Sequence, residues 1–355
     1  MGGKNLSYHE QKNIDYTLQL RELLGTLPPY ATDYFRAVEG RTSPRTRISY
    51  AYDFLVFFHF LLENNPSLCG KQVREITLND LDQLKSDDIE EYQEYLKYYQ
   101  TETAKQKNST GSIARKLSSL RSFFNYFYKK QLLKNNAVMQ VDIPKKHDKA
   151  IIHLEPDEVA ILLDGMESYG SQLTGQKKAY YEKTKVRDLA IVTLLLGTGI
   201  RVSECVGLDL NDLNFREGSM RIIRKGGDEA VLYFGREVED ALLDYIDGPR
   251  KLIAAQALAG HENALFYSVQ KKRISVHAVE NLVEKYAQVF VPNKKITPHK
   301  LRSTFGTSLY KETGDIYLVA DALGHSDVDT TRKHYAALEE NRRRKAASAI
   351  KLREV

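Results

Sequence analysis

The chain has few cysteines and no long apolar run. Only two of its 355 residues are cysteines, Cys69 and Cys205, and neither stands in a disulfide or zinc spacing. This usage favours a reducing compartment. No stretch of about 18 consecutive apolar residues occurs, and residues 1–11 lack the apolar segment of a signal peptide. We therefore expect a cytoplasmic protein with no membrane association.

Motifs for nucleotide and metal binding are also missing. The sequence contains no glycine-rich GxxxxGK[ST] loop for a nucleotide phosphate. It has no cluster of paired carboxylates near its histidines that would hold Mg²⁺. We therefore expect a chemistry that uses no metal, no ATP and no other cofactor.

The charge is small overall but unevenly distributed. Lys and Arg exceed Asp and Glu by 52 to 47, which gives a net charge of +5. Residues 51–100 hold 4 basic and 10 acidic side chains, whereas residues 101–150 hold 11 and 3. This asymmetry predicts a surface directed at a polyanion such as DNA. An ordinary solvated helix is the alternative.

Apolar periodicity predicts two domains. Residues 1–142 are expected to be all helical, with helices over 8–24 and 30–38 and a longer one starting at Ser43-Pro44. Residues 150–355 are expected to be mostly helical with a small antiparallel sheet, whose hairpin joins strands 219–224 and 229–234. A short strand is expected near 265–267. The polar segment 143–150, interrupted by a proline, is the expected linker.

The segment 297–335 gathers polar side chains at helix ends. Thr297 and Pro298 are typical of a helix start, and His299 and Arg302 then stand three residues apart in its first turn. A second helix, residues 315–323, is expected to stop at Gly324.

His325 follows that glycine directly, and Tyr335 lies in a third element. Backbone N–H groups at helix starts can also meet an anion. The segment is therefore a candidate site for an anion.

Two upstream segments add a second arginine and a lysine. A loop bracketed by glycines places Arg201 at the start of a helix, with Glu204 one turn later. A strand then runs into a Gly-Gly turn that carries Lys225 at its tip.

Six polar side chains in this order resemble the signature of the tyrosine recombinase (phage-integrase-like) family: Arg, Lys, His-x-x-Arg, His or Trp, and Tyr. The matching residues are Arg201, Lys225, His299, Arg302, His325 and Tyr335. The resemblance implies a mainly α fold, in which an all-α, SAM-like core-binding bundle precedes an α+β catalytic domain. We expect an extension over residues 1–42, the bundle over 43–142, the linker over 143–150 and the catalytic domain over 151–340.

The resemblance implies a site-specific recombinase that cuts and rejoins double-stranded DNA through a 3′-phosphotyrosine. Tyr335 would be the nucleophile, and the two arginines would hold the non-bridging oxygens. His299 would act as the base and His325 as a donor to the phosphate. Lys225 would protonate the departing 5′-oxygen. Religation needs neither ATP nor metal because the bond energy is retained.

One spacing departs from the family pattern. The family most often has nine residues from the second histidine to the tyrosine, whereas Tyr335 lies ten after His325 and His334 takes the ninth place. We place the extra residue in the loop 326–329. Tyr310 and Tyr317 fit the apolar stripes of their own helices, so Tyr335 stays the predicted nucleophile.

Basic and hydroxyl side chains in the first domain are the expected DNA contacts. A helix over 112–130 has an apolar stripe, and its cations and small hydroxyls lie largely off that stripe. The first turn of the helix after Ser43 is expected to direct two arginines outward. The predicted DNA-binding residues are Arg45, Arg47, Arg115, Lys116, Ser119 and Arg121.

The remaining expectations concern assembly and biological role. Residues 341–355 would dock in trans on a neighbouring copy, giving a cyclic homotetramer on two duplexes. An insertion over 168–184 is similar to one in single-recombinase Xer proteins of Gram-positive bacteria, which favours chromosome dimer resolution, with a DNA translocase or accessory protein as a further partner. The alternatives are an integrase of a phage or conjugative element and a non-catalytic DNA-binding regulator.

Overall fold

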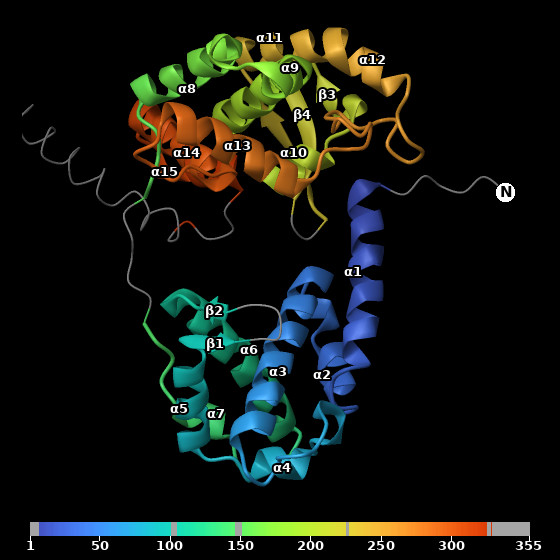
Figure 1. The fold of residues 1–355 in the computed structure, drawn as a ribbon, viewed down its shortest axis with the longest axis vertical. Coiled ribbons are helices and arrows are strands. Elements are labelled where there is room, and N and C mark those ends of the chain that lie inside the picture. Colours follow the sequence, from blue (N-terminus) through green and yellow to red (C-terminus); the bar gives the residue numbers. More distant parts are fainter. Residues whose placement is uncertain (1–6, 101–104, 146–150, 225–226, 325–327, 329–355) are drawn as a thin grey trace, which may run out of the picture. The chain divides into compact units, whose positions relative to one another are not determined.

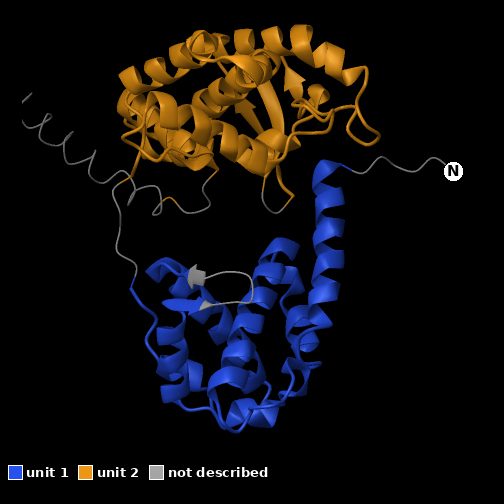
Figure 2. Ribbon diagram, in the orientation of Figure 1, with its two compact units in different colours: residues 1–148 blue, residues 149–355 orange. Residues whose placement is uncertain are grey.

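The computed structural model describes residues 7–100, 105–145, 151–224, 227–324 and 328. The chain divides into two compact units, residues 1–148 and residues 149–355 (Figure 2). Helices dominate both units, and the second also contains a three-stranded antiparallel sheet. The predicted fold class is therefore confirmed. None of the described helices combines the length and the apolar character needed to cross a membrane.

Unit 1 is a helical bundle built on two long helices, α3 (Pro44–Asn64) and α6 (Thr110–Lys129) (Figure 1). Helix α3 begins where the sequence predicts, because Ser43 Oγ accepts a hydrogen bond from the Thr46 N–H at 3.2 Å. The short hairpin of β1 (Tyr98–Gln100) and β2 (Lys105–Lys107) is an exception to the all-helical structure expected for residues 1–142. The other elements of unit 1 are α1 Tyr8–Leu24, α2 Ala31–Ala37, η1 Glu39–Arg41, η2 Val73–Glu75, α4 Leu78–Asp82, α5 Ser86–Tyr95, β1 Tyr98–Gln100, β2 Lys105–Lys107 and α7 Ala137–Gln140.

Aromatic side chains fill the core of unit 1. The rings of Phe54 on α3 and Phe123 on α6 have centroids 4.5 Å apart, and Phe57 meets Tyr92 edge-on at 5.0 Å. All four side chains are fully buried. Aromatic pairs of this geometry contribute about 0.5–1.5 kcal/mol each beyond their buried area. The α3–α6 contact therefore holds the bundle together.

A buried carboxylate ties the same two helices together. Asp53 on α3 is 2 % exposed and accepts three sets of hydrogen bonds from α6. Arg115 donates to both carboxylate oxygens at 2.5 and 2.7 Å, Lys116 Nζ donates at 3.0 Å, and Ser119 Oγ donates at 3.1 Å. Because a buried charge is costly unless it is paired, this network depends on all of its members.

Unit 2 surrounds one long helix, α9 (Gly175–Thr198), which packs against α8, α11, α13 and α14 (Figure 1). The prediction of a short strand near 265–267 is wrong, because the chain around this segment forms only the isolated bridges Asp209–Ala264 and Tyr267–Arg273. The other elements of unit 2 are α8 Pro156–Ser168, η3 Tyr169–Gln172, α10 Val202–Gly207, η4 Leu210–Asp212, β3 Leu213–Asn214, β4 Ser219–Ile223, β5 Glu229–Tyr233, α11 Arg236–Tyr245, η5 Ile246–Arg250, α12 Lys251–Ala254, α13 Val276–Phe290, α14 Pro298–Thr313 and α15 Ile316–Leu323.

The segment expected to be an insertion, residues 168–184, is largely the start of α9. Tyr181 on this helix is buried, and its hydroxyl donates to the carbonyl oxygens of Met166 at 2.8 Å and Glu167 at 2.6 Å. The segment is therefore anchored on α8.

In the sheet, β4 lies between β3 and β5, and Met220 pairs with Leu232 in the predicted hairpin.

The Asp53 network generates a stability prediction. Asp53→Asn keeps the size of the side chain but removes its charge, which leaves Lys116 buried without a carboxylate. Breaking a buried ion pair from one side costs about 3–5 kcal/mol, and we expect a loss of that order in urea unfolding. The control is Asp33→Asn, whose exposed pair with Arg36 should contribute less than about 1 kcal/mol. Equal losses in the two variants would contradict the account.

Candidate active site

Arg201 is placed by a tight turn between α9 and α10. Gly199 ends α9 in the left-handed conformation, with φ of 61°, and Arg201 caps α10 two residues later. The Arg201 guanidinium donates to Glu204 Oε1 at 2.8 Å and to the carbonyl oxygen of Gly324 at 2.9 Å. Glu204 also accepts from the Arg201 backbone N–H at 3.0 Å. Glu204 therefore fixes both the backbone and the side chain of Arg201.

Arg302 reaches the same region from α14. Its side chain is buried, with the residue 6 % exposed. Its guanidinium donates to the carbonyl oxygen of Gly199, before Arg201, and to that of Leu323, at the end of α15. Arg302 thus joins the turn that carries Arg201 to the turn that leads to residue 325.

A third guanidinium, that of Arg224, completes the cluster. Arg224 directly follows β4, and its Nη2 donates to the carbonyl oxygen of Asp321 at 3.3 Å. Gly324 caps α15 with φ of 56°, and a Cβ added there would lie 2.4 Å from Arg224 Cζ. Glycine is therefore needed at position 324 for its backbone conformation and for the close approach of Arg224. Arg224 is not among the site residues predicted from the sequence.

Guanidiniums from three separate elements thus surround the end of α15. Their carbonyl partners at this end are those of Asp321, Leu323 and Gly324. The carbonyl end of a helix carries partial negative charge, which favours nearby cations. Among the described residues, Glu204 supplies one carboxylate to this cluster of three guanidiniums, through its pair with Arg201. A cluster of this kind can bind an anion such as a phosphate.

The other predicted catalytic residues are only partly within the described structure. His299 lies in the first turn of α14 and is exposed, while Arg302 three residues later is buried. Lys225, His325 and Tyr335 lie outside the described residues. Their positions in the sequence place Lys225 next to Arg224 and His325 next to Gly324, so the described cluster borders both.

Other candidate nucleophiles in unit 2 have different surroundings. Tyr310 is 3 % exposed and packs with Val319 and Leu323, as its apolar stripe predicts. The same expectation for Tyr317 is wrong, because that side chain is 72 % exposed. Cys205 is fully buried on α10, and burial raises the pKa of its thiol to about 12. A thiol that stays protonated is a poor nucleophile.

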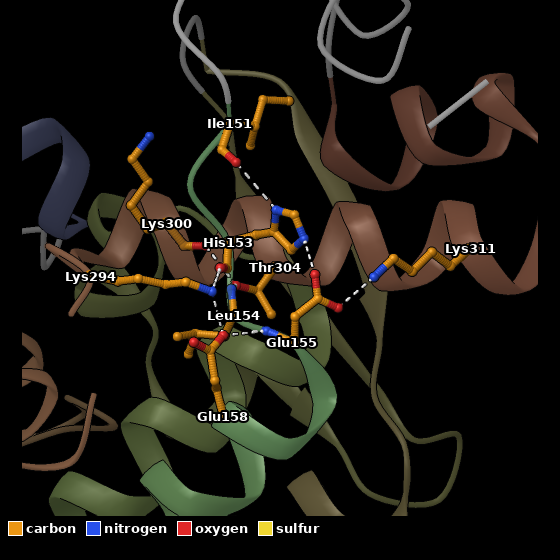
Figure 3. Close-up of polar contacts among 9 residues, drawn as sticks. All are labelled: Ile151, His153, Leu154, Glu155, Glu158, Lys294, Lys300, Thr304 and Lys311. Atoms are coloured by element: carbon orange, nitrogen blue, oxygen red, sulfur yellow. Dashed lines mark hydrogen bonds and ion pairs between the residues drawn. The ribbon is translucent and has the colours of Figure 1, made fainter. Parts of the chain in front are cut away.

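The segment 151–158 is tied to α14, as Figure 3 shows. The buried Leu154 N–H donates to Thr304 Oγ1 at 2.9 Å. Glu155 accepts from Lys311 at 2.6 Å and contacts a ring nitrogen of His153 at 2.9 Å. The hydrogen bond from Lys311 holds the pKa of the Glu155 carboxyl below its usual range. These contacts fix the helix that carries His299 and Arg302.

The predicted DNA-binding side chains of unit 1 differ in accessibility. Lys116 is 8 % and Ser119 1 % exposed, so the expectation that they lie on an outer face is wrong. Arg47 was expected to point outward, yet it is 8 % exposed and donates to Glu39 at 3.1 Å. Helical periodicity does not reveal the acidic partners of these side chains, Asp53 and Glu39, because those partners lie on other elements. Arg45 is exposed, and the Arg115 side chain is 46 % exposed.

Arg121 has partners within its own unit. Its guanidinium donates to the carbonyl oxygen of Val138 at 3.2 Å and to that of Val141. It therefore links α6 to α7 and to the residue that directly follows α7.

Two family models match the chain. The model described as "Phage integrase family" matches residues 136–342, and "Phage integrase, N-terminal SAM-like domain" matches residues 32–131. The first match covers both arginines of the sequence motif, the hairpin and the end of α15.

Curated relatives match over most of the chain. The tyrosine recombinase XerC of Caldanaerobacter subterraneus subsp. tengcongensis is 32 % identical over 93 % of this chain and 85 % of its own. The tyrosine recombinase XerS of Streptococcus agalactiae is 30 % identical over 88 % of this chain and 93 % of its own. XerS of Lactococcus lactis subsp. cremoris is 29 % identical over similar shares, 88 % and 92 %.

Solved structures share the fold. The XerH site-specific recombinase bound to its difH substrate aligns with a TM-score of 0.61 at 20 % identity, over 86 % of this chain and 80 % of that one. The Tn1549 transposon integrase with circular intermediate DNA aligns with a TM-score of 0.60 at 18 % identity, over 85 % and 93 %.

The contacts of the segment 151–158 with α14 generate a second prediction. Thr304→Val keeps the shape of this buried side chain but leaves the Leu154 N–H without its acceptor. An unsatisfied buried donor costs about 1–3 kcal/mol, and we expect that loss in urea unfolding. Ser303→Ala removes a neighbouring hydroxyl whose partner among the described residues is the carbonyl oxygen of the exposed His299, and should change stability by less than about 0.5 kcal/mol. A Thr304→Val protein as stable as the Ser303→Ala protein would refute the anchoring role.

Proposed function

We propose a reaction mechanism for this chain from the premise that it belongs to the phage integrase family and is a site-specific DNA recombinase of the Xer tyrosine-recombinase type. The Tyr335 hydroxyl attacks the phosphorus of one DNA strand. A bond from phosphorus to the tyrosine oxygen forms, and the bond to the 5′-oxygen breaks. A 5′-hydroxyl from another duplex later reverses the step and joins the strands. Because each step exchanges one phosphodiester for another, the cycle needs neither ATP nor a metal.

The observation that carries this proposal is the convergence of guanidiniums at the end of α15. Arg201 and Arg302 hold the carbonyls of Gly324 and Leu323, directly before His325 in the sequence. Arginine stays charged throughout the reaction and matches two phosphate oxygens at once. Donors fixed before the substrate arrives are often the largest catalytic contribution, and loss of one lowers the rate by about 10²–10³.

The proton transfers are assigned to the remaining residues. Tyrosine has an intrinsic pKa of about 10, so Tyr335 must lose its proton during attack. His299 receives this proton, and Lys225 donates one to the departing 5′-oxygen. His325 donates a hydrogen bond to a non-bridging oxygen. These roles follow the order and contexts of the six residues in the sequence.

The proposed partner is double-stranded DNA, held by both units. Arg45 and the half-exposed Arg115 are the phosphate contacts of unit 1 that remain accessible. We further propose a cyclic homotetramer on two duplexes, in which residues 341–355, outside the described structure, dock on a neighbouring copy. The linker is assigned to residues 143–150. A cytoplasmic location fits a DNA substrate and two free cysteines.

We propose chromosome dimer resolution as the biological role. The relatives with about 30 % identity are named XerC and XerS, which favours this role over that of a mobile-element integrase. The fold of the Tn1549 transposon integrase is also similar, so the fold alone does not separate the two roles. An excisionase gene beside the coding sequence would overturn the chromosomal assignment.

Replacement of the nucleophile tests the mechanism. Tyr335→Phe should bind DNA like the wild type and form no covalent adduct with a nicked suicide substrate on a denaturing gel. The adduct requires the phenolic oxygen, whereas binding does not. An adduct that persists in this variant, mapped to His334 or Tyr310, would move the nucleophile elsewhere.

The salt dependence of binding tests whether both units hold the DNA through its phosphates, an arrangement that we call the clamp. A protein that contacts roughly 6–10 phosphates loses about 10³–10⁵ in affinity between 50 and 200 mM salt, because counterions are released. We expect a decrease in this range in fluorescence anisotropy titrations. Arg45→Ala should lower the slope of log affinity against log salt by about 1. A flat salt response would exclude the clamp.

A further inference from the structure

The backbone of Arg224 closes the turn that contains Lys225. The Arg224 N–H donates to the carbonyl oxygen of Asp228 at 2.8 Å, and the Arg224 carbonyl accepts from the Gly227 N–H at 3.0 Å. Lys225 is followed in the sequence by Gly226 and Gly227. Glycines have the greatest backbone freedom to lose, so a turn of this composition needs an anchor to hold its lysine in one place.

The side chain of Arg224 supplies a contact outside the hairpin. Its Nη2 donates to the carbonyl oxygen of Asp321, 97 residues further along the chain. An ideal Cβ on Gly324 would lie 2.4 Å from Cζ and 2.5 Å from Nη1 of Arg224, so the guanidinium lies directly against that glycine. Arg224 Nε is buried and finds no acceptor among the described residues. The guanidinium is therefore placed by its packing against the end of α15.

We propose that Arg224 is a positioning residue: its contact with the end of α15 determines how well Lys225, the next residue in the sequence, serves as the proton donor to the departing 5′-oxygen. This inference rests on the proposed function. Arg224 stands one residue before Lys225, and its guanidinium lies against the residue before His325. One side chain thus joins the residue before the proposed proton donor to the residue before the proposed phosphate ligand.

The alternative is that Arg224 is an ordinary surface arginine of the hairpin, with no role in placing another element. Arg221, three residues earlier on β4, is an arginine of that kind. Its exposed guanidinium pairs within the sheet region, with Asp212 at 3.0 Å and Glu229 at 3.2 Å. Arg224 instead reaches another element, and Gly324 leaves the space for it. Arg221 is therefore the matched control.

The test compares two suicide substrates in single-turnover cleavage. One has the natural 5′-oxygen at the scissile bond, and the other has a 5′-bridging sulfur, whose thiolate leaves without a proton. Arg224→Ala should cleave the oxygen substrate about 10–10² times more slowly, because a small misplacement of a catalytic group has an effect of this size. On the sulfur substrate it should regain most of this loss, as Lys225→Ala should. Arg224→Lys should be intermediate, and Arg221→Ala should stay within about twofold of wild type on both.

A second perturbation moves the guanidinium and leaves Arg224 in place. Gly324→Ala puts a methyl group where Arg224 lies, and should reproduce the sulfur-reversible loss. Gly260 shares a positive φ, 82°, but has nothing within 4 Å of an added Cβ. Gly260→Ala therefore imposes similar backbone strain away from the site, and should cleave both substrates like the wild type.

Several outcomes would overturn the inference, and they are distinct. Wild-type cleavage of the oxygen substrate by Arg224→Ala would show that the contact positions nothing. An equal loss on both substrates would show that Arg224 acts on the phosphate or on folding. Failure of sulfur to rescue Lys225→Ala, with normal adducts in the wild type, would remove Lys225 as the donor and this inference with it. Absence of any adduct in the wild type would instead refute the proposed function on which the inference rests.

Discussion

The carbonyl groups at the end of α15 are held by guanidiniums that come from three separate elements of unit 2. Arg201 comes from the cap of α10, Arg224 from the end of β4 and Arg302 from α14. These residues are up to 101 positions apart in the sequence (302 − 201 = 101) and meet only when the unit is folded. The packing around α9 therefore determines whether the site exists at all, since α9 contacts α10, α11 and α14.

Placing three like charges together is unfavourable unless their surroundings compensate. Here the compensation comes from the buried Glu204, from the polarised end of α15 and from the carbonyls that accept their hydrogen bonds. Arginine has five N–H donors, and the contacts of Arg201 among the described residues engage two of its nitrogens. Donors therefore remain for a phosphate. A phosphorane carries more charge than the phosphodiester, so fixed guanidiniums stabilise the transition state more than the substrate.

Local features of the sequence predicted much of this structure. The helix over 8–24, the start of α3 at Ser43-Pro44 and the glycine end of α15 are all determined within a few residues, and the structure has each of them. Long-range contacts were not predictable in this way. Lys116 and Ser119 were assigned to an outer face because periodicity does not reveal a buried carboxylate such as Asp53 on another helix. Arg224 was missed for the same reason.

The central claim is that the guanidiniums of Arg201 and Arg302 bind the charged oxygens of the scissile phosphate. The most direct test replaces one non-bridging oxygen with a methyl group and measures adduct formation by the wild type and by Arg201→Ala. On the natural phosphate, Arg201→Ala should lower the rate by about 10²–10³. If Arg201 acts on the oxygens, the two changes are coupled, and most of that loss should disappear on the neutral methylphosphonate. The same loss on both substrates would contradict the account, because Arg201 would then act independently of the phosphate charge.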